Sequence, residues 1–138
     1  MLIYGISTRQ LKDKIIWKNM IHILQNYDFD AYKTLVENNY TDNDAENWFS
    51  EYESEGRKGI GAFLYDIIKD AEELELDIDD PDGNVYIGIS AAAPWEFHPS
   101  VKSLSKEHFD AIMNKYVVLI TGEETCIQWW KVDDDLDW

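Results

Sequence analysis

The apolar positions of the first forty residues predict one strand followed by two helices. Leu2 to Ile6 is a short run of apolar and β-branched residues, as is typical of a strand. Ser7 and Gln10 then match a capping box, which marks the start of a helix. Apolar residues recur at helical spacing from Leu11 to Leu24 and predict one long helix there. A second, short helix is expected to begin near Phe29 and to end near Asn38 and Asn39.

The middle of the chain predicts two more helices. Thr41 and Asp44 mark the start of the first one, which carries Trp48, Phe49 and Tyr52 on one face and is expected to end before Gly56. A broad apolar stripe from Ile60 to Leu74 then predicts the next helix, and this stripe is the clearest helical pattern in the sequence.

From Leu76 onward the period of the apolar residues changes to two, which indicates a β-hairpin. Leu76 to Ile78 and Val85 to Ile89 alternate with polar residues, and the turn residues Asp80 to Gly83 separate them. The stretch from Ala91 to Pro99 contains two prolines and is expected to be a surface loop.

The last third predicts one helix and one strand. Ser105 begins the helix, and the segment from Val117 to Ile120 suits either a helix or a strand; we favour a helix that continues to Gly122. Residues 125–132 are expected to form the final strand. Its candidates for burial are Cys126, either Trp129 or Trp130, and Val132.

These elements predict an α+β fold for residues 1–138. We expect about five helices and a small, mostly antiparallel sheet of three to four strands, with a single layer of helices on the sheet. The chain has 138 residues, of which 45% are hydrophobic, so it can close one core and is expected to form a single acidic domain. Residues 133–138 are expected to be a frayed acidic tail.

The net charge excludes one class of function and the composition excludes another. The chain carries 12 Lys and Arg residues against 28 Asp and Glu residues, a formal charge of −16. Direct binding of nucleic acid through a basic face is therefore not expected, because phosphate contacts require cationic side chains. The aromatic content of 14% excludes an intrinsically disordered acidic chain.

Three features of the sequence favour the cytoplasm. The first ten residues lack the basic start and apolar core of a secretory signal. No apolar run approaches the length of a membrane span, so no membrane interaction is expected. The single cysteine, Cys126, has no internal partner for a disulfide.

The negative charge is concentrated in residues 41–82, which carry a net charge of −12. On helical wheels most of these carboxylates fall into three rows beside the apolar faces. The rows consist of Asp42, Glu46 and Glu53; of Asp44, Glu51 and Glu55; and of Asp66, Asp70 and Glu73. The simplest interpretation is that they are solvated flanks of amphipathic helices.

Two details argue that these carboxylates are more than solvated flanks of helices. Like charges stand four residues apart in pairs such as Asp66 and Asp70, at a cost of about 0.2–0.5 kcal/mol each. Carboxylates also crowd the predicted C-terminal ends of two helices, where they oppose the helix dipole at about 0.3–1 kcal/mol each. Charge that is unfavourable locally often serves a binding site.

We therefore expect a surface that binds a basic partner, with exposed aromatic side chains such as Trp48 as anchors. The candidate partner-binding residues are Asp44, Glu51, Glu55, Asp66, Asp70, Glu73, Asp79, Asp80, Asp82 and Trp130. The leading hypothesis is an inhibitor that occupies the basic nucleic-acid groove of a nuclease or similar enzyme, as phage anti-CRISPR or anti-restriction proteins do. The alternatives are a bacterial immunity protein that neutralises a nuclease toxin, and an acidic adaptor domain.

The sequence contains no recognisable catalytic, metal or cofactor motif. The aspartates from Asp77 to Asp82 precede Gly83, but placing that glycine at the sixth position of a calcium loop puts Ile78 and Ile89 at ligand positions. The three histidines and Cys126 lack the spacing of metal ligands. We expect no enzymatic activity, no cofactor and no metal.

Overall fold

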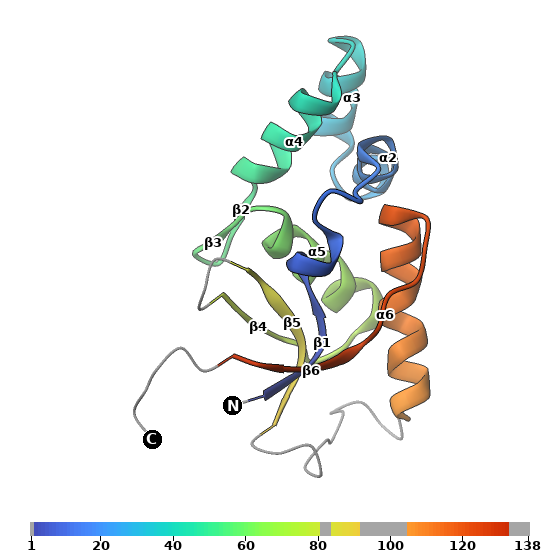
Figure 1. Ribbon diagram of the computed structural model, residues 1–138. Coiled ribbons are helices and arrows are strands. Elements are labelled where there is room, and N and C mark those ends of the chain that lie inside the picture. The colour runs from blue at the N-terminus through green and yellow to red at the C-terminus, as the bar shows by residue number, and fades with distance from the viewer. Residues whose placement is uncertain (1, 81–83, 92–104, 133–138) are drawn as a thin grey trace.

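The computed structural model describes residues 2–80, 84–91 and 105–132 (Figure 1). In this part of the chain there are six helices, a four-stranded antiparallel sheet and a separate two-stranded hairpin. The predicted α+β class and the antiparallel sheet are confirmed. Residues 81–83, 92–104 and 133–138 lie outside the described chain. These segments include most of the predicted loop from Ala91 to Pro99 and the whole predicted tail.

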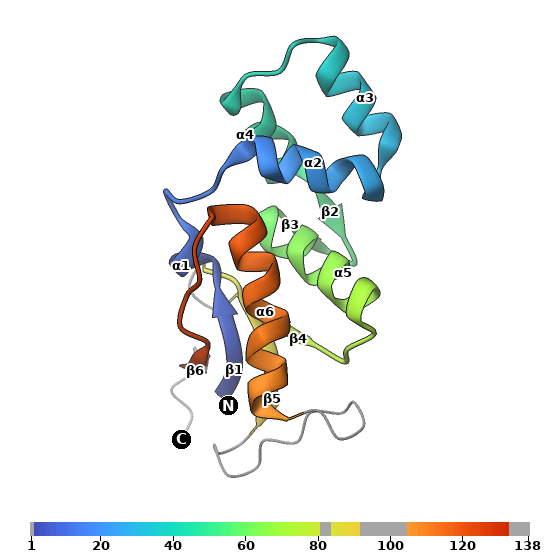
Figure 2. The same cartoon turned by 90° about the vertical axis from the view of Figure 1, so that its right-hand side faces the viewer.

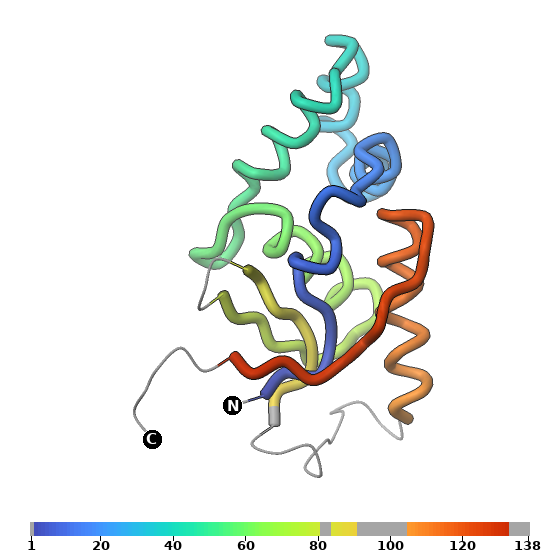
Figure 3. Tube along the Cα trace, in the orientation of Figure 1, coloured from blue at the N-terminus to red at the C-terminus, as the bar shows by residue number. Residues whose placement is uncertain are grey.

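The sheet is built around the N-terminal strand. Its strands are β1 (Leu2–Ser7), β4 (Asp77–Asp79), β5 (Tyr86–Ala91) and β6 (Gln128–Lys131). They are arranged in the order β4-β5-β1-β6, so that β4 and β6 form the two edges (Figure 3). Every neighbouring pair is antiparallel, and β4 and β5 form the hairpin that the alternating pattern predicts.

Alternation along the strands separates two apolar faces. Tyr4 belongs to the main core and has the ring of Trp129 5.1 Å from its own. Its neighbour Ile3 belongs to a smaller cluster with Tyr86, against which Trp130 packs at 5.5 Å. The two tryptophans of β6 are thus each half-buried, on opposite faces of the sheet. Cys126, one of the predicted candidates for burial, is instead exposed and lies before the strand begins.

Two helices form the layer on the sheet. These are α5 (Ile60–Glu72) and α6 (Lys106–Thr121), which lie side by side in Figure 2. The segment that suits either a helix or a strand is helical, and α6 ends where Gly122 adopts a left-handed φ of 85°. None of the described helices is long and apolar enough to span a bilayer.

Three further helices continue beyond this layer. They are α2 (Trp17–Tyr27), α3 (Phe29–Glu37) and α4 (Asp42–Glu51), at the top of Figures 1 and 2. The main core continues into them, because buried residues of α2 and α4 join those of α5, α6 and the sheet. The core includes Met20, Phe49, Phe63, Leu64 and Phe109, each fully buried.

The prediction of one long helix from Leu11 to Leu24 is wrong. The Ser7 capping box is present, but the helix that it starts, α1 (Thr8–Leu11), ends after one turn. Asp13 then has a left-handed φ of 64°, and the Ile16 amide donates a hydrogen bond to the Ile120 carbonyl at 2.8 Å. This contact with the end of α6 diverts the chain, and apolar spacing alone does not detect it.

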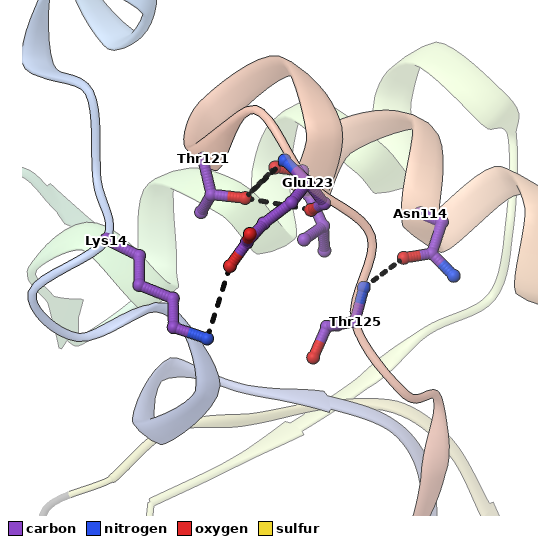
Figure 4. A network of polar contacts seen from close by, with 6 residues as sticks. Lys14, Asn114, Thr121, Glu123 and Thr125 are labelled. Carbon is purple, nitrogen blue, oxygen red and sulfur yellow. Dashed lines mark hydrogen bonds and ion pairs between the residues drawn. The ribbon is translucent and has the colours of Figure 1, made fainter.

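A network of polar contacts also holds the chain segments around the end of α6 (Figure 4). Lys14 forms an ion pair with Glu123 at 3.4 Å. The Thr121 hydroxyl accepts a hydrogen bond from the Glu123 amide, and Asn114 Oδ1 accepts one from the Thr125 amide at 2.8 Å. These bonds turn the chain after α6 and lead it toward β6.

The segment after α4 also differs from the prediction. The helix ends at Glu51, and β2 (Glu53–Ser54) and β3 (Arg57–Lys58) form a small hairpin in place of a last helical turn. The two turn residues, Glu55 and Gly56, both have positive φ, as a type I′ turn requires. Glu53 and Glu55 are therefore hairpin residues, and the two predicted rows on α4 are each shortened by one carboxylate.

A close backbone approach in the sheet predicts a large effect of one methyl group. Gly5 and Gly88 face each other in the register of β1 and β5, and a β-carbon on Gly5 would overlap the Ile87 carbonyl oxygen. We expect Gly5→Ala to lower the free energy of unfolding by about 3 kcal/mol, measured by urea denaturation. The control Gly122→Ala has ordinary contacts and should cost only about 1 kcal/mol, through its positive φ. Equal losses would contradict this explanation.

Candidate functional site

An open groove of about 620 Å³ lies between α3 and α4. Its walls combine aromatic, amide and acidic side chains. The lining residues are Leu35, Asn38, Tyr40, Asp44, Asn47, Trp48, Glu51 and Tyr52. We call it the α3–α4 groove; it brings together two of the predicted partner-binding carboxylates and two residues of the predicted aromatic stripe.

Helical spacing explains how the acidic rim of this groove forms. Asp44, Trp48 and Glu51 stand four and three residues apart, so they share one side of α4. The rise of a helix places the two acidic residues about 10 Å apart, with Trp48 between them. Both carboxylates are exposed.

Each rim carboxylate already uses one of its oxygens. Oδ2 of Asp44 accepts a hydrogen bond from the Thr41 amide at 2.9 Å, as the second half of a capping box. Oε2 of Glu51 lies 3.0 Å from Lys58 Nζ. This hydrogen bond, together with the charge of Glu51, raises the pKa of Lys58. Within the described chain, the second oxygen of each carboxylate has no hydrogen bond.

The floor of the groove is fixed by packing against α5. The Phe49 ring of α4 lies 4.9 Å from Phe63, and Trp48 packs edge-on against Phe49 at 4.9 Å. The Tyr52 hydroxyl donates a 2.6 Å hydrogen bond to Asp66 of α5. Burial and this bond to the carboxylate raise the pKa of the Tyr52 phenol, which is therefore neutral at physiological pH.

This bond corrects the predicted role of Asp66. The side chain is 7% exposed and belongs to the interior, so Asp66 does not offer its charge to a partner. On the helical wheel Asp66 lies at the edge of the apolar face of α5. Because Tyr52 at the end of α4 packs against this edge, Asp66 is buried. The predicted row of Asp66, Asp70 and Glu73 is therefore interrupted.

The opposite flank of α4 borders a second hollow. This hollow has a volume of about 470 Å³, and Asp42, Glu46 and Asp13 contribute carboxylates to its lining. The predicted division of the α4 carboxylates into two flanks is thus present in the structure. The helix carries acidic side chains on both sides of its buried stripe of Ala45 and Phe49.

One side of the molecule carries eight exposed carboxylates on neighbouring elements. In Figure 1, α4, the β2–β3 hairpin and β4 lie one below another on the left, away from α6. Arg57 Nη2 of the hairpin donates to the Ile78 carbonyl of β4 at 3.4 Å, which joins the two elements. Residues 42–58 and 77–80 contain nine acidic and two basic side chains. We call this surface the acidic side.

Asp70 and Glu73 lie elsewhere. They stand at the C-terminal end of α5, whose N-terminal end adjoins the hairpin, and 13 helical residues span about 20 Å. Asp70 lines a separate apolar groove of about 540 Å³ between α2, α5 and α6, and Glu73 adopts a left-handed φ of 55° after the helix. The carboxylates of residues 41–82 therefore do not all share one surface, because the length of α5 separates Asp70 and Glu73 from α4 and the hairpin.

The remaining predicted residues have varied positions. Asp80 is exposed on the acidic side, while Asp79 is half-buried and accepts a hydrogen bond from the Asp80 amide at 2.9 Å. Asp82 lies outside the described residues. Trp130 stands on β6, at the opposite edge of the sheet from β4, and its indole donates to the Gly5 carbonyl at 3.1 Å. Trp130 is thus engaged in the fold and is distant from the acidic side.

Lysines of the same chain relieve part of the predicted strain at helix ends. Lys58 pairs with Glu51 at the end of α4, and Lys115 lies 2.6 Å from Glu72 at the end of α5. Burial alone raises the pKa of Glu72, but hydrogen bonds from Lys115 and Tyr116 outweigh it, so the pKa is lowered. These lysines come from other elements, which the helical wheel of one segment cannot include.

Tyr40 is a groove residue that the sequence analysis missed. It immediately precedes the N-cap residue Thr41, at a position where an apolar residue commonly packs back on the helix. This position before the cap is the sequence signal that could have identified Tyr40. Among the described residues, no three His, Cys, Asp or Glu side chains are grouped so as to hold a metal ion. Comparison with family models, curated proteins and solved structures finds no match to the chain.

The bond between Tyr52 and Asp66 predicts a measurable energetic coupling. We expect Tyr52→Phe to lower the free energy of unfolding by about 1–3 kcal/mol, because it leaves a buried carboxylate without its donor. Urea denaturation of the single variants and of the double variant with Asp66→Asn gives the coupling between the two sites. Additive losses would show that the hydrogen bond contributes nothing.

The lowered pKa of Glu72 predicts a loss of stability in acid. A carboxyl group with a lower pKa in the folded state stabilises the fold above its ordinary value of 4.5, and this contribution falls as the pH drops below that value. The free energy of unfolding should therefore differ between wild type and Glu72→Gln more at pH 7 than at pH 3. Glu75→Gln removes one exposed charge as a control. A difference for Glu72→Gln that stays constant over this range would disprove the assignment.

Proposed function

We propose that this protein is an acidic inhibitor that captures a basic, nucleic-acid-processing enzyme in the cytoplasm. The observation that carries the proposal is the acidic side, whose segments contain nine acidic side chains and only two basic ones, Arg57 and Lys58. Among the described residues, Glu51 is the only one of the nine with an ion pair. Charge left uncompensated within the fold is available to a partner.

The physical basis of inhibition is competition for a cationic groove. An enzyme that binds nucleic acid presents lysines and arginines to the phosphates, and rows of carboxylates are attracted to the same groups. The carboxylates of α4 stand on a helix anchored to α5 through Phe49, so they are held in fixed positions. A protein surface seated there excludes the substrate without any chemistry of its own.

Two other functions share part of this reasoning. An immunity protein would use the same surface against a nuclease toxin, and the identity of the captured partner separates it from an inhibitor of a host defence enzyme. An acidic adaptor domain would bind a partner with no role in nucleic-acid metabolism. The distribution of charge favours a basic partner, as expected for an inhibitor or for an immunity protein.

Charge neutralisation on the acidic side tests the proposal. Wild type and the triple variant Asp44→Asn/Glu51→Gln/Glu55→Gln are immobilised and exposed to a lysate of the source organism at low and high salt, and bound proteins are identified by mass spectrometry. We expect wild type to retain a basic nucleic-acid-processing enzyme at low salt and to release it at high salt. Titration of the purified enzyme should show at least about tenfold weaker binding by the triple variant.

The far end of α5 offers a matched control. The variant Asp70→Asn/Glu73→Gln/Glu107→Gln loses the same net charge from exposed positions, two at that end and one in the first turn of α6. It should bind like wild type. Equal weakening by both triple variants would mean that total charge alone matters, and undiminished binding by the first would overturn the proposal. Inhibition of the captured enzyme, relieved by added DNA or RNA, is the required functional readout.

A further inference from the structure

The indole ring that lines the α3–α4 groove has no cation over it within the described chain. Elsewhere lysines lie over aromatic rings, as Lys69 does over Tyr65 at 4.8 Å and Lys106 over Tyr4 at 4.7 Å. No lysine or arginine in the described part of the chain lies over Trp48. A half-buried indole with no cation over it thus lies between two exposed carboxylates.

The chemistry of an arginine side chain suits the kinds of group that line this groove. The guanidinium is planar, stacks on aromatic rings, and offers several N–H donors in a fork that matches a carboxylate. Asp44 and Glu51 each have an oxygen without a hydrogen bond among the described residues, and Asn38 and Asn47 add amide groups to the lining. Tyr40, Tyr52 and Leu35 are suited to the apolar stem.

We propose that the α3–α4 groove is a receptacle for an arginine side chain of the basic partner. This inference rests on the proposed function and specifies the chemistry that anchors the partner. Arginine is favoured over lysine because a compact ammonium gains less from the aromatic floor and cannot pair in a fork with a carboxylate. A second copy of this chain is an unsuitable occupant, because two molecules that each carry a charge of −16 repel each other.

The test uses three short capped peptides, Gly-Arg-Gly, Gly-Lys-Gly and Gly-citrulline-Gly, added to the intact protein. Binding is followed by the NMR signal of the Trp48 indole N–H, assigned by its loss in Trp48→Phe. We expect the arginine peptide to shift this signal and to bind about threefold to fivefold more tightly than the lysine peptide. The citrulline peptide has nearly the same shape without the charge and should cause no shift.

Two double variants locate the binding. Asp44→Asn/Glu51→Gln keeps an amide oxygen that can accept the capping hydrogen bond, removes both rim charges, and should weaken binding of the arginine peptide about tenfold. Asp70→Asn/Glu73→Gln removes the same charge at the far end of α5 and should leave it unchanged. Stability of each variant is checked by urea denaturation, so that loss of binding is not confused with unfolding.

The outcomes separate this inference from the function on which it rests. The inference is overturned if the Trp48 signal does not move at millimolar arginine peptide, if lysine and arginine shift it equally, or if both double variants weaken binding alike. If it fails while the capture of a basic enzyme still depends on Asp44, Glu51 and Glu55, the proposed function stands without the arginine site. If capture is also insensitive to these carboxylates, both are wrong.

Discussion

The packing of α4 on α5 is the constraint on which the acidic side depends. Phe49 meets Phe63 at 4.9 Å in a fully buried contact, and Tyr52 adds a hydrogen bond to the buried Asp66. These contacts fix the rotation of α4 about its axis. Once Ala45 and Phe49 face inward, the helical period places Asp42 and Glu46 on one flank and Asp44 and Glu51 on the other. A different rotation would bury carboxylates at a cost that the core could not offset.

The protein compensates its own charge selectively. Lysines meet carboxylates at the C-terminal ends of α4 and α5, where negative charge opposes the helix dipole and is most costly to the fold. The carboxylates in the first turn of α4, in the hairpin and in β4 have no such partners among the described residues. Those at the start of α4 cost little, because they interact favourably with the positive end of the dipole and one of them completes the capping box of Thr41. The fold is therefore compatible with a strongly acidic side.

The aromatic residues serve packing and recognition at the same positions. Trp48 fills space against Phe49 and Phe63, while the rest of its indole lines the α3–α4 groove between Asp44 and Glu51. A ring held by a core is an effective anchor, because little conformational freedom is lost when a partner binds. Trp130 shows the opposite case, since its indole N–H is already bonded to Gly5 and its ring lies near Tyr86 and Arg9.

The sequence by itself determined the elements whose signals are local. The stripe of α5, the β4–β5 hairpin and the caps at Ser7 and Thr41 each follow from spacing within a few residues, because these patterns report which face is buried and where backbone groups need partners. Tertiary structure decided the rest. The bond from Ile16 to Ile120 interrupts the first helix, and the approach of Tyr52 buries Asp66. Each of these depends on residues far apart in the chain, and a periodic pattern contains no information about which distant segment will meet it.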